Sequence, residues 1–271
     1  MHQYSSPSAL TPLSLTDLAA MKQRGEKISC LTAYDAAFSA LIDQVGVDIM
    51  LVGDSLGMVI QGHHSTLPAT VRDMVYHSRC VSNARQRAFI IADLPFMSYA
   101  TPALAAKNAA KLMQLGGAQM VKLEGAKSEC IRFLVDQGIP VCGHLGLLPQ
   151  SINQLGSYKV QGKDQAAADK ILNDALLLQQ AGASLLVLEC VPASLAKHIS
   201  TELQIPVIGI GAGVDCDGQV LVLYDMLNIG TIKRPRFSRN FMTGAESIEA
   251  AVRAYHQAVK QSLFPAAEHS F

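Results

Sequence analysis

Short apolar runs alternate with longer amphipathic stretches along the whole chain. A run of four to eight mostly apolar residues is typical of a strand that is buried on both faces. By this pattern we predict strands at 28–34, 49–53, 89–92, 118–123, 140–143, 184–188, 205–210 and 220–224.

The longer stretches between these runs repeat their apolar residues with the period of a helix. They predict helices near 36–45, 70–87, 102–115, 127–137, 164–181, 192–203 and 245–262. Several of them end at a glycine, which is a common helix stop. The interval between Gly211 and Val220 is too short for a full helix, so we expect one abbreviated crossover.

Apolar strands separated by helices indicate an α/β fold whose parallel sheet is covered on both faces. Eight such units favour a single closed (β/α)8 TIM barrel over an open, doubly wound sheet, and about 250 residues is the usual size of that barrel. No linker divides the 271 residues. We therefore predict a loose N-terminal segment at 1–12 and one catalytic barrel domain at 13–271.

The composition and the charge balance indicate which class of partner the protein binds and in which cell compartment it works. Lys plus Arg and Asp plus Glu number 22 each, so no net charge favours nucleic acid or an anionic membrane, and a small molecule is the expected partner. No apolar run reaches the roughly 18 residues of a membrane span. The first fifteen residues contain no Lys or Arg, and neither a secretory signal nor a transit peptide is visible. We expect a cytoplasmic protein.

The six cysteines are spread along the chain without a C-x-x-C pair. This spacing is more typical of reduced thiols than of a disulfide framework or a zinc site. Four of them lie in apolar runs, where a free cysteine packs as a small hydrophobe: Cys30, Cys130, Cys142 and Cys190.

Polar residues follow the apolar runs at the carboxyl ends of six predicted strands. They are Tyr34 and Asp35, Asp54 and Ser55, Asp93, Lys122 and Glu124, His144, and Glu189. The active sites of TIM barrels lie at this face, because the loops that follow the strands form it. We therefore expect these side chains to share one mouth of the barrel, where buried carboxylates must be paired or bound to metal.

Lys122 and Glu124 lie two residues apart on a strand, so both point to the same side, into the barrel. A structural Lys–Glu ion pair is one interpretation. Carboxylates with few Cys or His neighbours instead favour a hard cation, and Mg²⁺ fits best. Asp54 and Asp93 are the best direct ligands, with Glu124 as a third, although an Asp after a strand can also cap a helix.

Two further features have weaker implications. The glycine run at 209–213 either cradles an anion, as in a phosphate-binding barrel, or allows close backbone approach at the rim. His144 follows an apolar strand and favours a role in the site. His63 and His64 belong to a predicted loop, where they either line the site or are solvated, and His77 and His198 belong to predicted helices, where a surface role is expected.

Ten motifs occur in an order that makes the sequence specific. They are TAYD (32–35), MLVGDSLGM (50–58), STLP (65–68), ADLPF (92–96), VKLEG (121–125), PVCGHLGLLPQS (140–151), YKVQG (158–162), LLVLECVP (185–192), PVIGIGAG (206–213) and AEHSF (267–271). Together they resemble the ketopantoate hydroxymethyltransferase family from about residue 13 to the C-terminus. The chain departs from the family at His64, where Asp is usual, and varies within 214–219 and 227–237.

The resemblance implies a (β/α)8 barrel, a homodecamer of pentamer rings and one Mg²⁺ per subunit. The implied reaction joins 3-methyl-2-oxobutanoate to the one-carbon unit of 5,10-methylenetetrahydrofolate and gives 2-dehydropantoate, the first step toward pantothenate. Carried over by motif, the metal residues are Asp54, Asp93 and Glu124. Ser55 and Lys122 correspond to substrate contacts, and Glu189 corresponds to the catalytic base. We expect His144 to hydrogen-bond the substrate or a neighbouring carboxylate.

Two rival interpretations remain at the level of sequence. One is another Mg²⁺-dependent barrel enzyme that acts on a 2-oxo acid, of the phosphoenolpyruvate mutase and isocitrate lyase type. The other is a non-catalytic barrel that binds a phosphorylated ligand through its glycine run. Folate-dependent product formation separates the first rival from the hydroxymethyltransferase, and the cluster of ionisable residues argues against the second.

Overall fold

Eight parallel strands close into a barrel in the computed structural model, which describes residues 11–157, 159–230 and 234–271. The strands are β1 (Ile28–Thr32), β2 (Ile49–Val52), β3 (Phe89–Asp93), β4 (Met120–Glu124), β5 (Val141–Gly146), β6 (Leu185–Glu189), β7 (Val207–Ile210) and β8 (Gly218–Leu221). Each strand pairs with its neighbour in sequence, and β8 pairs with β1 to close the ring. This confirms the (β/α)8 barrel. Most of the predicted segment 1–12 lies outside the described residues.

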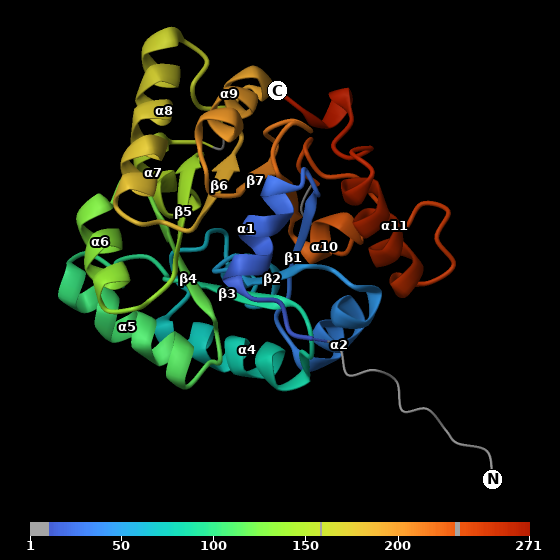
Figure 1. The fold of residues 1–271 in the computed structure, drawn as a ribbon. Helices are drawn as coiled ribbons and strands as arrows, with labels where there is room; N and C mark the ends of the chain where they lie inside the picture. Colours follow the sequence, from blue (N-terminus) through green and yellow to red (C-terminus); the bar gives the residue numbers. More distant parts are fainter. Residues whose placement is uncertain (1–10, 158, 231–233) are drawn as a thin grey trace.

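The helices surround the barrel on its outside (Figure 1). They are α1 (Leu15–Gln23), α2 (Ala36–Val45), α3 (Leu56–Val59), α4 (Val71–Ala84), α5 (Pro102–Gln114), α6 (Ser128–Asp136), α7 (Ile152–Leu155), α8 (Gln165–Gln180), α9 (Ala193–Glu202), α10 (Leu223–Met226) and α11 (Ile248–Lys260), with 3-10 turns at Pro149–Ser151 and Ala267–His269. All seven predicted helices are present. The short connection from β7 to β8 contains no helix, which confirms the abbreviated crossover.

The predicted strand at 220–224 was wrong in its bounds. β8 begins two residues earlier, at Gly218, and the apolar run ends in the helical turn α10. An apolar run looks the same whether it enters a buried strand or a buried helical turn, so composition could not separate the two. Gly218 is required where β8 meets β1, because a Cβ there would lie 2.3 Å from the carbonyl oxygen of Ile28.

Helix α1, which the pattern did not predict, lies across one end of the barrel (Figure 1). Its first turn carries a capping box in which Ser14 and Asp17 satisfy each other's backbone amides. Leu18 and Met21 are buried and join the interior of the barrel. The ammonium of Lys22 lies 2.7 Å from the carboxylate of Asp217, so α1 is also fixed to the segment before β8.

Successive residues of each strand alternate between two cores, as a period of two requires. On β4, Met120 faces the interior of the barrel, whereas Val121 and Leu123 pack beneath the helices. The inward assignment of Lys122 and Glu124 is thereby confirmed. The four cysteines expected in apolar runs are all buried as free thiols.

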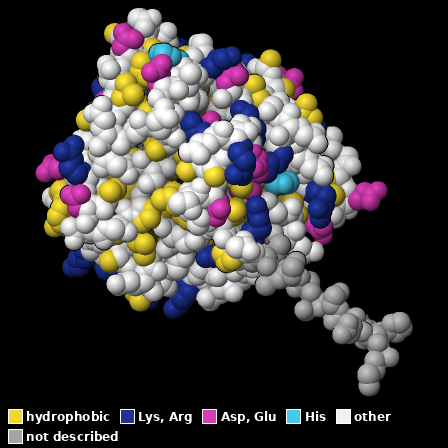
Figure 2. All heavy atoms as spheres, in the orientation of Figure 1, with side chains coloured by type: hydrophobic (Ala, Val, Ile, Leu, Met, Phe, Trp, Pro, Cys, Tyr) yellow, Lys and Arg dark blue, Asp and Glu magenta, His cyan; other side chains and the backbone are white. Residues whose placement is uncertain are grey.

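Basic and acidic side chains are interspersed over the face in Figure 2, in keeping with the balanced composition. Within the part of the chain that the structure describes, no helix is both long enough and apolar enough to cross a membrane.

Candidate active site

A cavity of about 560 Å³ opens at the carboxyl ends of the strands. The inward rows of side chains begin with apolar residues and end with polar ones. On β3, Phe89 and Ile91 are followed by Asp93, and on β6, Leu185 and Val187 are followed by Glu189. The cavity therefore lies directly above the apolar layers of the barrel interior. The same alternation that turns apolar residues into the barrel also turns the polar residues at the strand ends into the cavity.

Asp93 and Lys122 form a buried ion pair at the bottom of this cavity. The ammonium of Lys122 lies 2.6 Å from Oδ1 of Asp93, and both side chains are about 95% buried. Burial alone would lower the pKa of Lys122, but the surrounding carboxylates, Asp93 foremost, raise it above its usual value. The lysine is therefore a permanent cation. The other oxygen of Asp93 accepts the backbone amide of Asp54 at 3.1 Å.

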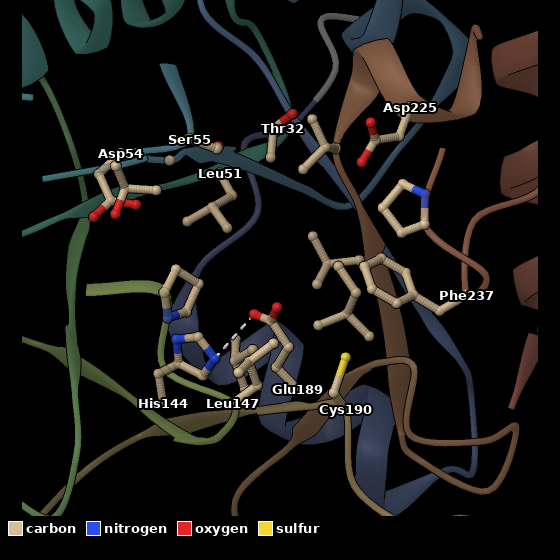
Figure 3. Close-up of a pocket in the computed structure, with 18 of the residues that line it drawn as sticks. Thr32, Leu51, Asp54, Ser55, His144, Leu147, Glu189, Cys190, Asp225 and Phe237 are labelled. Atoms are coloured by element: carbon tan, nitrogen blue, oxygen red, sulfur yellow. Dashed lines mark ion pairs between the residues drawn. The ribbon is translucent and has the colours of Figure 1, made fainter. Parts of the chain in front are cut away.

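His144 lies between two carboxylates on the neighbouring strands. Its Nδ1 is 3.6 Å from Glu124 and its Nε2 is 3.3 Å from Glu189 (Figure 3). Burial would lower the pKa of His144, but the two carboxylates outweigh it and raise that pKa to about 9. At neutral pH the imidazole is protonated, so one cation holds both carboxylates in place.

Gln150 completes the cluster, and the sequence reasoning did not single it out. Its side-chain amide donates to Oδ2 of Asp54 at 2.8 Å, and its backbone amide donates to Glu124 at 3.0 Å. The hydroxyl of Tyr99 donates to the side-chain oxygen of Gln150. A polar residue in the buried turn after β5 was the available signal, but only the fold brings Gln150 to Asp54.

The two residue pairs that follow β1 and β2 have different roles. Ser55 lines the cavity, and its hydroxyl lies 2.8 Å from that of Tyr34. Asp35 does not line the cavity, because its carboxylate accepts the amide of Phe38 and caps α2. The expectation that Asp35 would face the mouth was wrong, and the capping alternative explains it.

The other four histidines considered from the sequence, His63, His64, His77 and His198, lie outside the cavity lining. His63 and His64 are exposed in the loop before α4, so the departure from the family at His64 falls away from the cluster. His198 is exposed on α9, as expected. The surface role predicted for His77 is not what the structure shows. Its ring nitrogen Nδ1 hydrogen-bonds the carbonyl oxygen of Tyr34 at 2.7 Å, so His77 stabilises the segment that follows β1.

The glycine run after β7 is closely packed. A Cβ on Gly209 would lie 2.8 Å from the sulfur of Cys216, and one on Gly213 would lie 2.6 Å from the side chain of Ala193. At Gly211, where φ is +61°, it would meet the rings of Phe237 and Phe271 at about 3 Å. These contacts support close backbone approach as the reason for the glycines.

The donor set of the cluster fits a hard divalent cation. The cluster contains four carboxylates, Asp54, Asp93, Glu124 and Glu189, and the cations that contact them are Lys122 and His144. Burial, reinforced by the charges of Asp93 and Glu124, raises the pKa of Asp54 well above its usual value. A cation beside Asp54 would relieve that repulsion. Over the described ranges no three His, Cys, Asp or Glu side chains converge as a metal cage, and Mg²⁺ needs only one or two carboxylates.

The fold and the site together define a TIM barrel with an ionisable cluster at the catalytic face. Its fold is similar to that of phosphoenolpyruvate phosphomutase from Streptomyces platensis subsp. rosaceus, with a TM-score of 0.60 and 12% identity over 80% of this chain and 83% of that one. For a 2,3-dimethylmalate lyase of the PEP mutase/isocitrate lyase superfamily, the TM-score is 0.53 and the identity is 17%, over 72% of this chain and 70% of that one. At these identities the likeness concerns the fold alone.

Sequence comparison identifies the family. The profile of ketopantoate hydroxymethyltransferase matches residues 12–267. A protein named 3-methyl-2-oxobutanoate hydroxymethyltransferase from Alkalilimnicola ehrlichii is 56% identical over 100% of this chain and 99% of its own length. One of the same name from Methylobacillus flagellatus is 59% identical over 96% and 100%. The chain belongs to the ketopantoate hydroxymethyltransferase family of enzymes, which confirms the resemblance.

Proposed function

We propose that the enzyme transfers the one-carbon unit of 5,10-methylenetetrahydrofolate to 3-methyl-2-oxobutanoate, with water, to give 2-dehydropantoate and tetrahydrofolate. Family membership supports the acceptor and the product. The observation that carries the chemistry is the buried cluster of Asp54, Asp93, Lys122, Glu124 and Glu189 in an otherwise largely apolar cavity. Such a cluster is costly to fold unless it binds something charged.

Asp54 and Asp93 would hold a Mg²⁺ ion, and Glu124 would be a third ligand through water. The bound ion would supply a Lewis acid for the oxygen on which negative charge develops. Lys122 and Gln150 keep these carboxylates in place by hydrogen bonds of 2.6 Å and 2.8 Å. The protein therefore fixes the carboxylates before any substrate arrives, so little reorganisation is needed during the reaction.

The 2-oxo acid presents a carboxylate and a keto oxygen to the cluster. Lys122 is the permanent cation that pairs with one of these oxygens. The hydroxyl of Ser55, which is held by that of Tyr34, fixes the orientation of the acid by hydrogen bonding to another of its oxygens. His144 orients Glu189 through Nε2 and Glu124 through Nδ1. A single imidazolium thus couples the position of the base to that of the metal-binding carboxylates.

Glu189 would remove the proton from C3 of the oxo acid. Its carboxylate projects into the open middle of the cavity (Figure 3). One of its oxygens contacts His144, so the other is available to the substrate. The C3 proton passes to Glu189, and its electron pair moves into an enolate. Water adds to the one-carbon unit of the folate, and both carbon–nitrogen bonds of that unit break, which releases tetrahydrofolate and leaves the unit as formaldehyde. The enolate carbon then bonds to the formaldehyde carbon, and the resulting alkoxide takes back the proton from Glu189.

A coupled assay for 2-dehydropantoate tests the proposal. We expect product only when the oxo acid and methylenetetrahydrofolate are both present, loss of activity with a chelator, and recovery with Mg²⁺. Absence of product with both substrates would refute the function, and folate-independent turnover of another 2-oxo acid would favour the mutase-type rival.

A substitution at Asp54 tests the assignment of the metal ligands. Asp54→Asn should weaken Mg²⁺ binding and so alter the dependence of activity on Mg²⁺, with half-maximal activity requiring more of the ion. Asp35→Asn is a matched control, because Asn also caps a helix and residue 35 lies outside the cavity lining. An unchanged Mg²⁺ activation curve in Asp54→Asn would defeat the assignment.

A further inference from the structure

The cavity is larger than the oxo acid requires. Counting about 30 Å³ for each of the acid's eight non-hydrogen atoms, which is the volume of a liquid water, gives about 240 Å³ at most. The cavity measures about 560 Å³. The oxo acid therefore fills less than half of the cavity, and the rest is available to a second reactant.

The wall opposite Asp54 and Ser55 carries a carboxylate that does not belong to the ion-pair cluster, that of Asp225 (Figure 3). Asp225 lies on α10, and its carboxylate and the ring of Phe237 both face the cavity (Figure 3). Phe237 is fixed there by its close packing on Gly211. This wall is thus a flat aromatic ring beside an acidic group, separated from the cluster by the cavity itself.

Asp225 has no evident structural task. It lies in the first turn of α10, but no side chain caps that helix. Among the hydrogen bonds and ion pairs between described residues, none involves its carboxylate; the positive charge of Arg234 acts on it without a direct contact. Burial nevertheless raises its pKa to about 6. A partly desolvated carboxylate that caps nothing is costly, and a ligand with hydrogen-bond donors would compensate it.

We propose that Asp225 and Phe237 form the binding site for the pterin ring of the folate, with Asp225 accepting hydrogen bonds from the 2-amino group and the N3–H of its pyrimidine edge. The inference rests on the proposed function, which requires a folate. An ionised Asp only accepts hydrogen bonds and has two parallel oxygens, which match the two parallel N–H donors of this edge. The planar pyrimidine half of the reduced pterin also stacks favourably on an aromatic ring such as Phe237.

This orientation gives the rest of the folate a consistent place. With the amino edge at Asp225, the opposite side of the bicyclic ring, which carries the one-carbon unit, faces across the cavity toward Glu189 and Lys122. Arg236 lines the same cavity, is exposed, and lies with its guanidinium 5.2 Å from the ring centroid of Phe271. It is a suitable cation for the anionic glutamate tail, which must leave the cavity toward solvent.

The test separates the two substrates. Asp225→Asn replaces one acceptor by an NH₂ group that opposes the donors of the pterin, so KM for methylenetetrahydrofolate should rise roughly 10- to 100-fold, the value of a buried charge-assisted hydrogen bond. KM for the oxo acid and the exchange of its C3 proton with solvent, measured without folate, should change less than about twofold. Asp35→Asn is the matched control and should change neither.

A folate analogue without the 2-amino group checks the contact from the ligand side. Wild type should bind it more weakly than the parent folate, and Asp225→Asn should lose most of that discrimination. If wild type forms product but Asp225→Asn keeps the wild-type KM for folate, or still discriminates as wild type does, the pterin site is elsewhere. A collapse of C3 exchange in the variant would place Asp225 at the oxo acid and would also overturn the inference. Failure of wild type to use folate at all would refute the proposed function instead.

Discussion

Replacing Asp225 by Asn should stabilise the protein above neutral pH. The pKa of Asp225 rises from 3.8 in the unfolded chain to about 6 in the fold, chiefly through burial. Because the folded state holds the proton more tightly, the ionised side chain lowers the free energy of unfolding as the pH rises through this window. At about 1.4 kcal/mol per pKa unit, the penalty removed by Asp225→Asn is about 3 kcal/mol at pH 7.5, about half that at pH 5, and none well below pH 4.

Thermal unfolding at pH 7.5 and pH 5.0 measures this penalty. For a chain of this size a change of 1 kcal/mol moves the midpoint by about 2–4 °C, so a rise of several degrees is expected at pH 7.5 and a smaller one at pH 5.0. Asp35→Asn should show no pH-dependent gain. A midpoint for Asp225→Asn that is unchanged, or raised equally at both pH values, would show that burial does not penalise this carboxylate. The combination of weaker folate binding with higher stability would identify Asp225 as a residue kept for function.

Three further predictions concern the base and the barrel. Glu189→Gln should slow solvent exchange of the C3 proton by roughly 100- to 10,000-fold, and undiminished exchange would remove Glu189 from the role of base. Gly218→Ala should lower the free energy of unfolding by about 3 kcal/mol or more, the upper end for overpacking, since its Cβ would meet the backbone of β1. Gly143→Ala meets the movable ends of two leucine side chains, Leu178 and Leu186, and should lower it less in the same unfolding assay. Asp43→Asn should lower the free energy of unfolding by about 3 kcal/mol or more, because the carboxylate of Asp43 accepts hydrogen bonds from three backbone amides, those of residues 86 to 88. A thermal unfolding midpoint equal to that of wild type would contradict this.

Much of the barrel could be predicted from the sequence because its strands obey a simple period. Apolar runs of four to seven residues marked the strands, and polar residues at the ends of six of these runs marked the expected catalytic face. Lys122 and Glu124 could be placed inside the barrel from their spacing alone, and the structure confirmed that placement. The ligand and catalytic roles of the cluster remain predictions.

Local pattern failed where the outcome depends on residues distant in sequence. Asp35 and Asp54 both follow a strand, yet Asp35 caps a helix whereas Asp54 faces Gln150, 96 residues away. Gln150 and Asp225 lie in short turns without a marked period, so only the closed ring brings Gln150 to Asp54 and Asp225 to the cavity. The apolar run that contains the end of β8 and the start of α10 could not be divided by composition.

The inward rows that combine apolar packing with the reactive side chains have a consequence for folding. A shift of β4 by one residue would turn Val121 and Leu123 into the cavity and bury Lys122 beneath the helices. Such a misaligned chain would keep its helices and strands but could not bind an oxo acid. During refolding, regained turnover would therefore report the alignment of the whole ring, which a measurement of secondary structure content alone would miss.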